Sequence, residues 1–311
     1  ILARGETGAI DRQSMARGSV RTFALTLRLL PAAMRGEVTL ACLLARATDT
    51  VADAPGIDAA DRLALLAAMD QAIHGTGECG EWRGLPAAAG TRGEQALVAA
   101  FPQLVARLAR SDPGARERVR QVVGTIVSGQ ALDIRRFEVE GIHALANEAA
   151  LADYLWRVAG CVGKFWTEVT AARCPQALRR PLEQMTALGI RYGEGVQLLN
   201  ILRDAPEDWR RGRCYLPWRG AATEVGGAIP ATLFELMRSW LPKCREWLGD
   251  GHRYAEAVRG RRLRAATVLP ARIGVETLAA LDQAGREAWI DRVKVPRGRV
   301  RWLVVKSLLG G

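Results

Sequence analysis

Two short stretches of the chain gather acidic side chains within apolar surroundings. In "RATDTVAD" Asp49 and Asp53 lie four residues apart, and in "NILRDAPED" Asp204 and Asp208 repeat that spacing with Glu207 beside them. Residues four apart share one face of a helix, one turn from each other, so each pair sets two like charges side by side. The apolar run before each pair places these charges at helix ends that border a core, where their repulsion is less screened than on an open surface.

A hard divalent cation would relieve this repulsion. Mg²⁺ takes oxygen ligands, keeps several waters and is held by a few carboxylates together with substrate phosphates. An arginine stands in each stretch, Arg46 in the first and Arg203 in the second, and arginines bind phosphate oxygens in a bidentate manner. Acids and arginines together favour a site that holds a metal-bound diphosphate, with Mn²⁺ as a second candidate ion. The alternative interpretation is a pair of solvated helix ends, each neutralised by its arginine.

Apolar residues that return every three or four positions predict helices over most of the chain. The predicted helices cover residues 32–53, 58–74, 93–110, 114–138, 147–171, 176–204, 231–258 and 275–292. Pro206 lacks an amide hydrogen and is expected to bend or end its helix. The GxGxxG match "GTGECG" follows a helical segment instead of a strand, so it does not predict a dinucleotide-binding turn. We expect an all-α protein with one domain over residues 1–311, in which residues 1–18 are peripheral or poorly ordered.

Charge and cysteine usage limit the classes of partner and compartment. The net charge of +11 attracts polyanions, but the arginines are dispersed and no nucleic-acid-binding motif is present, so we expect no nucleic-acid partner. The six cysteines form no CxxC pair and are interpreted as reduced thiols of a cytoplasmic protein. The sequence contains no run of 18 uncharged residues, so it predicts no membrane span. The basic, amphipathic segment 295–311 could lie on the anionic inner face of a membrane or pack as an ordinary chain end.

Four stretches in a fixed order resemble the squalene and phytoene synthase family, the head-to-head prenyl synthases. They are "SVRTFALTLRLLP", "LLARATDTVAD", "DYLWRVAGCVG" and "GEGVQLLNILRDAPEDWRRGRCYLP", and the likeness runs from about Ser19 to at least Pro217. The threonine of "DTVAD" resembles squalene synthases more than phytoene synthases. The resemblance implies an all-α prenyl synthase fold with a central apolar cavity between two aspartate-bearing helices.

The resemblance also implies a reaction. In such enzymes two farnesyl diphosphates bind with Mg²⁺ and condense to presqualene diphosphate, which NADPH then reduces to squalene. Related end products within the family are dehydrosqualene, hydroxysqualene, phytoene and presqualene diphosphate itself. The alternative from another class is a catalytically silent helical protein that binds an isoprenoid or a lipid. The sequence is silent on the oligomeric state.

Roles are carried over to this chain by position. The metal ligands would be Asp49, Asp53, Asp204 and Asp208, with Glu207 as a supporting acid. Diphosphate oxygens would meet Arg21, Arg46, Arg203 and Arg213. Gln197 and Asn200 would line the second metal site, and Tyr154 would lie by the reacting carbons and help remove a proton.

Three features of this chain leave alternatives or departures from the family pattern. Val20 and Cys42 stand where the family usually has hydroxyl-bearing residues, which puts the diphosphate grip and proton handling in doubt. Ala159, Gly160 and Gly163 are small residues at helical spacing. They either leave room for a prenyl chain or let two helices approach closely.

Overall fold

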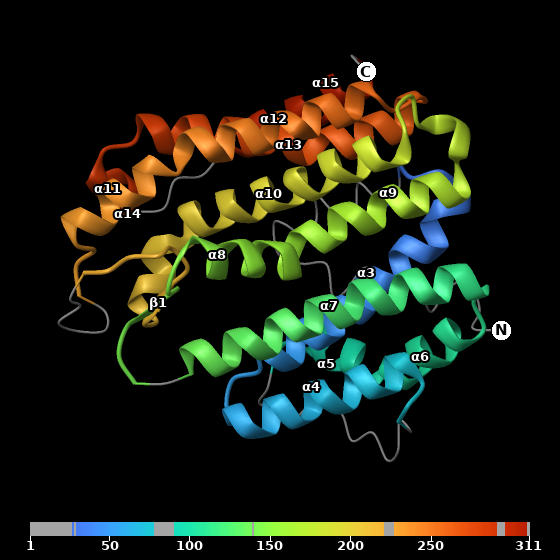
Figure 1. Cartoon of the computed structure of the whole chain (residues 1–311), viewed down its shortest axis with the longest axis horizontal. Helices are drawn as coiled ribbons and strands as arrows, with labels where there is room; N and C mark the ends of the chain where they lie inside the picture. The colour runs from blue at the N-terminus through green and yellow to red at the C-terminus, as the bar shows by residue number, and fades with distance from the viewer. Residues whose placement is uncertain are drawn as a thin grey trace. The chain divides into compact units, whose positions relative to one another are not determined.

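The computed structural model describes residues 27, 29–77, 90–138, 140–220, 227–290 and 296–309. The chain divides into two compact units, unit 1 from Ile1 to Arg135 and unit 2 from Arg136 to Gly311. Each unit is described by itself below, with the element labels of Figure 1. A single domain over residues 1–311 stays a prediction, and the segment 1–18 lies outside the described residues.

Unit 1 is built from helices that pack on α3. They are α3 (Ala32–Ala52), α4 (Ala59–His74), α5 (Arg92–Ala99), α6 (Phe101–Ala109) and α7 (Pro113–Phe137), whose last residues belong to unit 2. Asp58 begins α4 by accepting the Asp61 N–H at 2.8 Å, and Thr91 and Glu94 form a capping box at the start of α5. These caps explain why the predicted helix boundaries in this unit hold to within a few residues.

Unit 2 packs its helices around α10. Its elements are β1 (His143–Ala144), α8 (Glu148–Leu155), the π-helical turn η1 (Trp156–Gly160), α9 (Cys161–Arg173), the 3₁₀ turn η2 (Pro175–Ala177), α10 (Leu182–Arg210), β2 (Arg213–Cys214), α11 (Ala231–Ser239), α12 (Leu241–Glu256), α13 (Arg261–Gln283), α14 (Arg286–Ile290) and α15 (Arg297–Leu309). Figure 1 shows α10 running lengthwise beside α9, with α12 and α13 along its other side. Within the described ranges the strands amount to one short parallel pair, with His143 opposite Arg213. The all-α prediction is confirmed.

Three of the predicted helices are divided, and one of them, 275–292, both breaks between α13 and α14 and begins earlier than expected. The segment 93–110 breaks at Ala100 and the segment 231–258 breaks at Trp240, each just before a proline that occupies the first turn of the next helix. The helix predicted from residue 275 begins at Arg261 and continues through Pro270. No described helix is both long enough and apolar enough to cross a membrane.

Glycines let α9 and α10 approach closely. A Cβ atom added at Gly163 would lie 1.9 Å from the Gly189 carbonyl oxygen, and one added at Gly193 would lie 2.3 Å from the Ala159 carbonyl oxygen. A side chain at either place would push one backbone away from the other. Of the two interpretations of the small residues around Gly163, close helix packing is therefore the one that the structure bears out.

Of the two outcomes expected at Pro206, a bend or an end of the helix, the end does not occur, because α10 continues to Arg210. Pro206 has no N–H to donate to the Leu202 carbonyl, which would leave a buried acceptor without a partner. The indole Nε1–H of Trp289, from α14, donates to that carbonyl oxygen at 2.8 Å. Trp289 is fully buried. A side chain distant in sequence thus replaces the missing backbone hydrogen bond, and the last turn of α10 can form.

Candidate active site

The first acid region, made of Arg46, Asp49, Asp53 and Glu94, lies in unit 1 at the end of α3. Arg46 Nη1 donates to Asp49 Oδ2 at 2.5 Å, and its Nη2 donates to Glu94 Oε1 at 3.1 Å. The N–H of Asp53 donates to the Asp49 carbonyl oxygen at 3.0 Å, which places Asp53 at the exposed end of the helix. One guanidinium thus links two carboxylates from separate helices.

The Asp49 carboxyl is destabilised in its charged form. Partial burial, and then the charge of Asp53, raise the pKa of Asp49 from 3.8 to about 6, against the opposing effect of Arg46. The raised pKa means that Arg46 alone does not fully compensate the negative charge of ionised Asp49. A bound cation would supply the missing positive charge.

The second acid region, made of Arg203, Asp204, Glu207 and Asp208, lies in unit 2 on the last turns of α10. Arg203 holds Asp204 in a bidentate pair, with Nε to Oδ1 at 2.9 Å and Nη2 to Oδ2 at 2.5 Å. This hydrogen bonding raises the pKa of Arg203 above its ordinary value. Glu207 instead pairs with the exposed Arg211 at 2.6 Å. Asp204 is therefore neutralised by its neighbour, whereas Glu207 is engaged on the outer side of the helix.

Gln197 and Asn200 lie in line with this region. The Asn200 Nδ2 donates to Gln197 Oε1 at 3.3 Å. Positions 197, 200, 204 and 208 recur at intervals of three and four residues, so they form one stripe along α10. The structure thus aligns two polar amides with Asp204 and Asp208 on one face of one helix.

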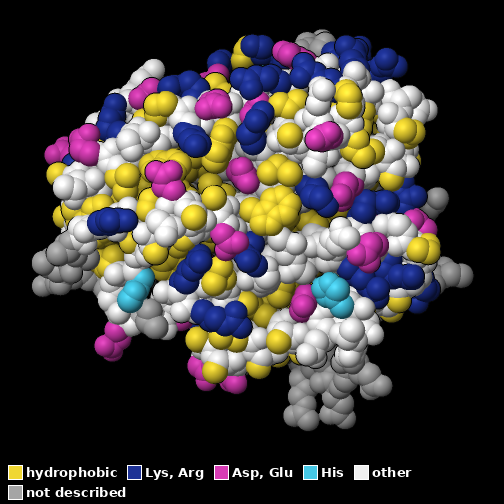
Figure 2. Space-filling model, in the orientation of Figure 1, with side chains coloured by type: hydrophobic (Ala, Val, Ile, Leu, Met, Phe, Trp, Pro, Cys, Tyr) yellow, Lys and Arg dark blue, Asp and Glu magenta, His cyan; other side chains and the backbone are white. Residues whose placement is uncertain are grey.

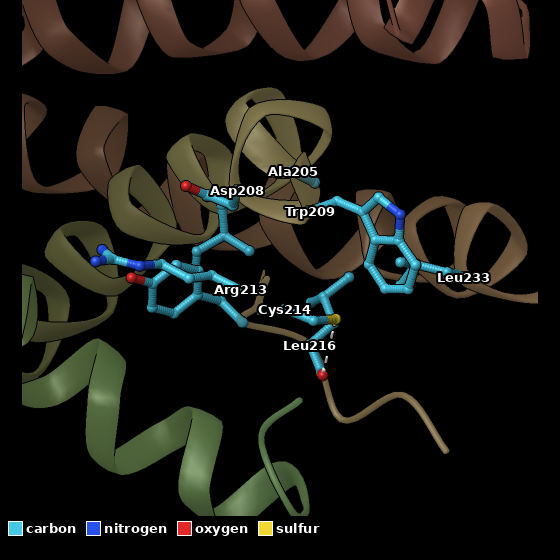
Figure 3. Close-up of a pocket in the computed structure, with 9 residues that line it drawn as sticks. Ala205, Asp208, Trp209, Arg213, Cys214, Leu216 and Leu233 are labelled. Carbon is cyan, nitrogen blue, oxygen red and sulfur yellow. Dashed lines mark hydrogen bonds between the residues drawn. The ribbon is translucent and has the colours of Figure 1, made fainter. Parts of the chain in front are cut away.

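A small hollow in unit 2 joins Asp208 to Arg213. It measures about 240 Å³ with its open side included and is lined by Ile201, Ala205, Asp208, Trp209, Arg213, Cys214, Tyr215, Leu216 and Leu233. Figure 3 shows Asp208 and Arg213 on one side of it and Trp209 with Leu233 on the other. The strand pairing of β1 with β2 holds Arg213, whose Nη2 donates to Glu138 Oε1 at 2.9 Å. Two of the predicted site residues therefore share one surface.

Tyr154 is buried in an aromatic cluster next to that hollow. Its ring lies 4.8 Å from the ring of Tyr215, which lies 4.9 Å from the ring of Phe137. Tyr215 also lines the hollow with Asp208 and Arg213. Sequence reasoning missed Tyr215, although it stands in the quoted "RCYLP". The signal was its position two residues after a predicted diphosphate-binding arginine.

The structure groups the predicted site residues within each unit. Arg46, Asp49 and Asp53 lie at the end of α3 in unit 1, and the remaining described ones lie in unit 2: Tyr154, Gln197, Asn200, Arg203, Asp204, Glu207, Asp208 and Arg213. Of the latter, Asp208 and Arg213 share the hollow, whereas Glu207 lies on the outer side of α10. Arg21 and Val20 lie outside the described residues. Cys42 lies half-buried on α3, one turn before Arg46. Sequence reasoning also missed Glu94, which shares Arg46 with Asp49.

The donor atoms suit a hard divalent cation. Oxygen ligands and arginine-held carboxylates match the preference of Mg²⁺ for carboxylates completed by water and phosphate. In the part of the chain that the structure describes, no three carboxylate, histidine or cysteine side chains gather around one point. Magnesium bound here would accordingly depend on a few carboxylates with water and substrate, and these metal ligands stay a prediction.

Solved structures identify the fold. A squalene synthase solved with a bound ligand superposes with a TM-score of 0.78 at 18% identity, over 97% of this chain and 85% of that one. A dehydrosqualene synthase solved with a ligand superposes with a TM-score of 0.63 at 19% identity, over 96% of this chain and 94% of that one. This is the all-α prenyl synthase fold.

Sequence relatives name the family. Residues 16–299 match the squalene/phytoene synthase family, and the chain belongs to it. A presqualene diphosphate synthase of Zymomonas mobilis is 30% identical over 61% of this chain and 60% of that protein. A 15-cis-phytoene synthase of Synechococcus elongatus is 30% identical over 66% of this chain and 59% of that protein. A phytoene synthase of Arthrospira platensis is 33% identical over 39% of this chain, so the chain spans from 41% to 60% of the length of these relatives.

The family consists of head-to-head prenyltransferases that use prenyl diphosphates and depend on magnesium. The resemblance to the family is therefore confirmed. The names of the relatives point more to phytoene or presqualene diphosphate than to squalene. The threonine of "DTVAD" is thus a weaker guide to the end product than to the family.

Proposed function

We propose that the chain joins two farnesyl diphosphates head to head to presqualene diphosphate and reduces this product to squalene with NADPH. The observation that carries the proposal is the same arrangement in two places, a D-x3-D pair at a helix end with an arginine against its first aspartate. Carboxylates and a diphosphate repel each other unless cations lie between them. A protein in which arginines pair with such acids is suited to binding a diphosphate together with metal ions.

The arginines would change partners when substrate binds. Arg46 and Arg203 contact carboxylates, and phosphate oxygens offer the same bidentate geometry. Asp49, Asp53, Asp204 and Asp208 would hold Mg²⁺, with Glu207 in support. Magnesium bound there would neutralise the charge on the departing diphosphate. Gln197 and Asn200 would orient the ligands of the second metal site, and Arg213 would hold diphosphate at the hollow beside Asp208.

The aromatic cluster would handle the cation and the proton. Loss of diphosphate leaves an allylic cation, which apolar and aromatic walls protect from water. Closure of the cyclopropane ring releases a proton, and the Tyr154 hydroxyl is proposed to help pass that proton on to the departing diphosphate, the strongest base that the reaction supplies. Tyr215, whose ring lies 4.8 Å away, would position the Tyr154 ring.

Product identity gives the test. Purified protein should be incubated with farnesyl diphosphate and Mg²⁺, with and without NADPH, and the products should be identified by mass spectrometry. We expect squalene with NADPH and presqualene diphosphate without it. The names of the relatives favour one second candidate, an enzyme that releases presqualene diphosphate as its end product. Presqualene diphosphate as the product both with and without NADPH would establish that candidate.

Controls separate a true negative from damaged protein. Asp49→Asn should be inactive, while Glu235→Gln, which removes an exposed acid on α11, should keep full activity. Phytoene from geranylgeranyl diphosphate, with no product from farnesyl diphosphate, would overturn the substrate assignment. No diphosphate release from either substrate by folded protein would overturn the enzyme assignment and leave the silent isoprenoid-binding protein.

A further inference from the structure

Helix α15 of unit 2 exposes apolar side chains among basic ones. From residue 292 to the end, the chain has no acid and six basic residues, namely Arg292, Lys294, Arg297, Arg299, Arg301 and Lys306. Leu303 and Ser307 are buried where α15 packs on α13. On the other side Trp302 is 45% exposed and Val305 is 50% exposed. Among its described side chains, the helix therefore exposes Trp302 and Val305 next to the basic Arg299 and Lys306.

Trp302 is held between two cations. The Arg299 guanidinium lies 4.2 Å from the centre of its ring, and the Lys306 ammonium lies 4.9 Å from that centre. Arg299 also pairs with Glu276 at 2.6 Å, which fixes it to α13. An exposed tryptophan flanked by basic groups suits the boundary between lipid headgroups and acyl chains, where its apolar body and the charges each find a matching environment.

A second basic surface, the arginine collar, consists of Arg179, Arg180, Arg259 and Arg262. Two loops form it, because the Arg179 N–H donates to the Ala257 carbonyl at 2.9 Å and the Arg259 N–H donates to the Ala177 carbonyl at 2.7 Å. All four side chains are exposed, and none of them has an ion pair with an acid in the described ranges. The acids nearest in sequence are the exposed Glu183 and Glu256. Leu182, which is 49% exposed, follows the first two arginines directly.

The last turns of α15 run toward the end of α13 at which the collar lies. Arg299 of α15 pairs with Glu276 of α13, and Ser307 accepts from Arg272 Nη1 at 3.0 Å. Moving forward along α15 therefore means moving backward along α13, so the two helices are antiparallel. The end of α15 points toward the start of α13, where the collar lies. Figure 2 shows dark blue side chains along the upper edge of unit 2, over α12, α13 and α15.

We propose that unit 2 docks on an anionic lipid bilayer through α15 and the arginine collar. The positive charges complement lipid phosphates, while Trp302, Val305 and Leu182 enter the headgroup layer. A nucleic acid would satisfy the arginines but would leave the exposed valine and leucine without a role. This pairing of charge with exposed apolar side chains favours the lipid surface, and it is independent of which reaction the chain catalyses.

Vesicle sedimentation tests the proposal. The full chain should sediment with mixed phosphatidylcholine and phosphatidylglycerol vesicles but not with phosphatidylcholine alone. Neutralising the collar by R179Q, R180Q, R259Q and R262Q together should weaken binding by about tenfold or more, because each basic residue near an anionic surface contributes to attraction. Trp302→Ser with Val305→Ser should also weaken binding by about tenfold, through loss of insertion instead of charge. Thermal melting confirms that each variant is folded.

A matched control separates this surface from net charge. The variant R92Q, R107Q, R110Q and R135Q removes the same number of exposed arginines elsewhere, and its binding should stay within about twofold of the unchanged chain. An equal loss in this control would overturn the proposal, because net charge alone would then explain the binding. Unchanged vesicle binding by the Trp302 and Val305 variant, together with equally tight binding to single-stranded RNA, would also overturn it and show a general polyanion surface.

Discussion

The two acid regions repeat one sequence pattern and differ in electrostatic state. In the first, Arg46 is shared between Asp49 and Glu94, and the pKa of Asp49 is still raised to about 6. In the second, Arg203 gives both of its donors to Asp204 alone. Equal D-x3-D spacing therefore does not produce equal sites. The first region lacks positive charge and should gain most from a cation, whereas the second must first release its arginine.

The largest expected effect is on turnover. Asp49→Asn and Asp204→Asn should each lower the rate of diphosphate release by on the order of 10²-fold or more, because each removes a ligand for the cation that stabilises the leaving group. Release is measured by a coupled diphosphate assay at saturating Mg²⁺. If only one of the two variants loses activity, the regions do not share the reaction.

The packing beneath the second region gives the next effect. Gly163→Ala should lower the free energy of unfolding by about 3 kcal/mol, because the new Cβ meets the Gly189 backbone and cannot be accommodated by a side-chain shift. Urea unfolding measures the change. Gly298→Ala, where an added Cβ meets nothing within 4 Å, is the control and should be near neutral. Equal stability of the two variants would mean that α9 and α10 do not pack this closely.

The last turn of α10 depends on the hydrogen bond that the Trp289 side chain donates to the Leu202 carbonyl oxygen. Trp289→Phe keeps the apolar ring but removes the donor to the Leu202 carbonyl, so it should cost about 1–3 kcal/mol as the buried acceptor loses its partner. Hydrogen exchange should rise in residues 203–210 and stay unchanged in α3. Unchanged exchange in α10 would show that the indole does not support the turn that carries Asp208.

The smallest expected effect is a difference between Asp49 and Asp204 in how their substitution changes stability with pH. Because the folded pKa of Asp49 is raised from 3.8 to about 6, its contribution to stability is full below pH 3.8 and is lost as the pH rises through 6. Without metal, the free energy of unfolding of Asp49→Asn, relative to that of the unchanged chain, should therefore rise by about 1 kcal/mol between pH 4 and pH 7. The expected change is this small because the Asp49 side chain is 40% exposed, so that solvent screens its charge. Asp204→Asn should lose stability at pH 7, because it breaks the pair with Arg203. Parallel pH profiles for the two variants would remove the distinction between the regions.

The sequence predicted local features well and contacts between distant residues poorly. Helices that begin at a cap, as at Asp58, were placed to within a residue, since caps and periodicity are local signals. Continuation of α10 past Pro206 could not be predicted, because it depends on Trp289, which lies 83 residues further along the chain. The start of α13 was missed because "GRRLRAATVLP" combines a basic start with an internal proline.

The candidate site follows the same division. The acids and their adjacent arginines were singled out from spacing, and the structure pairs Arg46 with Asp49 and Arg203 with Asp204. The alternative of neutralised helix ends expects the same contacts, so the metal-binding and diphosphate-binding roles stay predictions. The Glu94 partner of Arg46 and the contact of Tyr215 with Tyr154 were missed. These contacts depend on tertiary packing, which no spacing rule encodes.

The most direct test of the account is metal-dependent binding of a non-hydrolysable farnesyl diphosphate analogue, measured by calorimetry in a double-mutant cycle of Asp49→Asn and Asp204→Asn. The account predicts that binding requires Mg²⁺, that either substitution alone removes most of it, and that combining them adds little further loss. Independent, additive losses, or wild-type binding by either single variant, would contradict the claim that both acid regions are required to bind the metal-bound diphosphate.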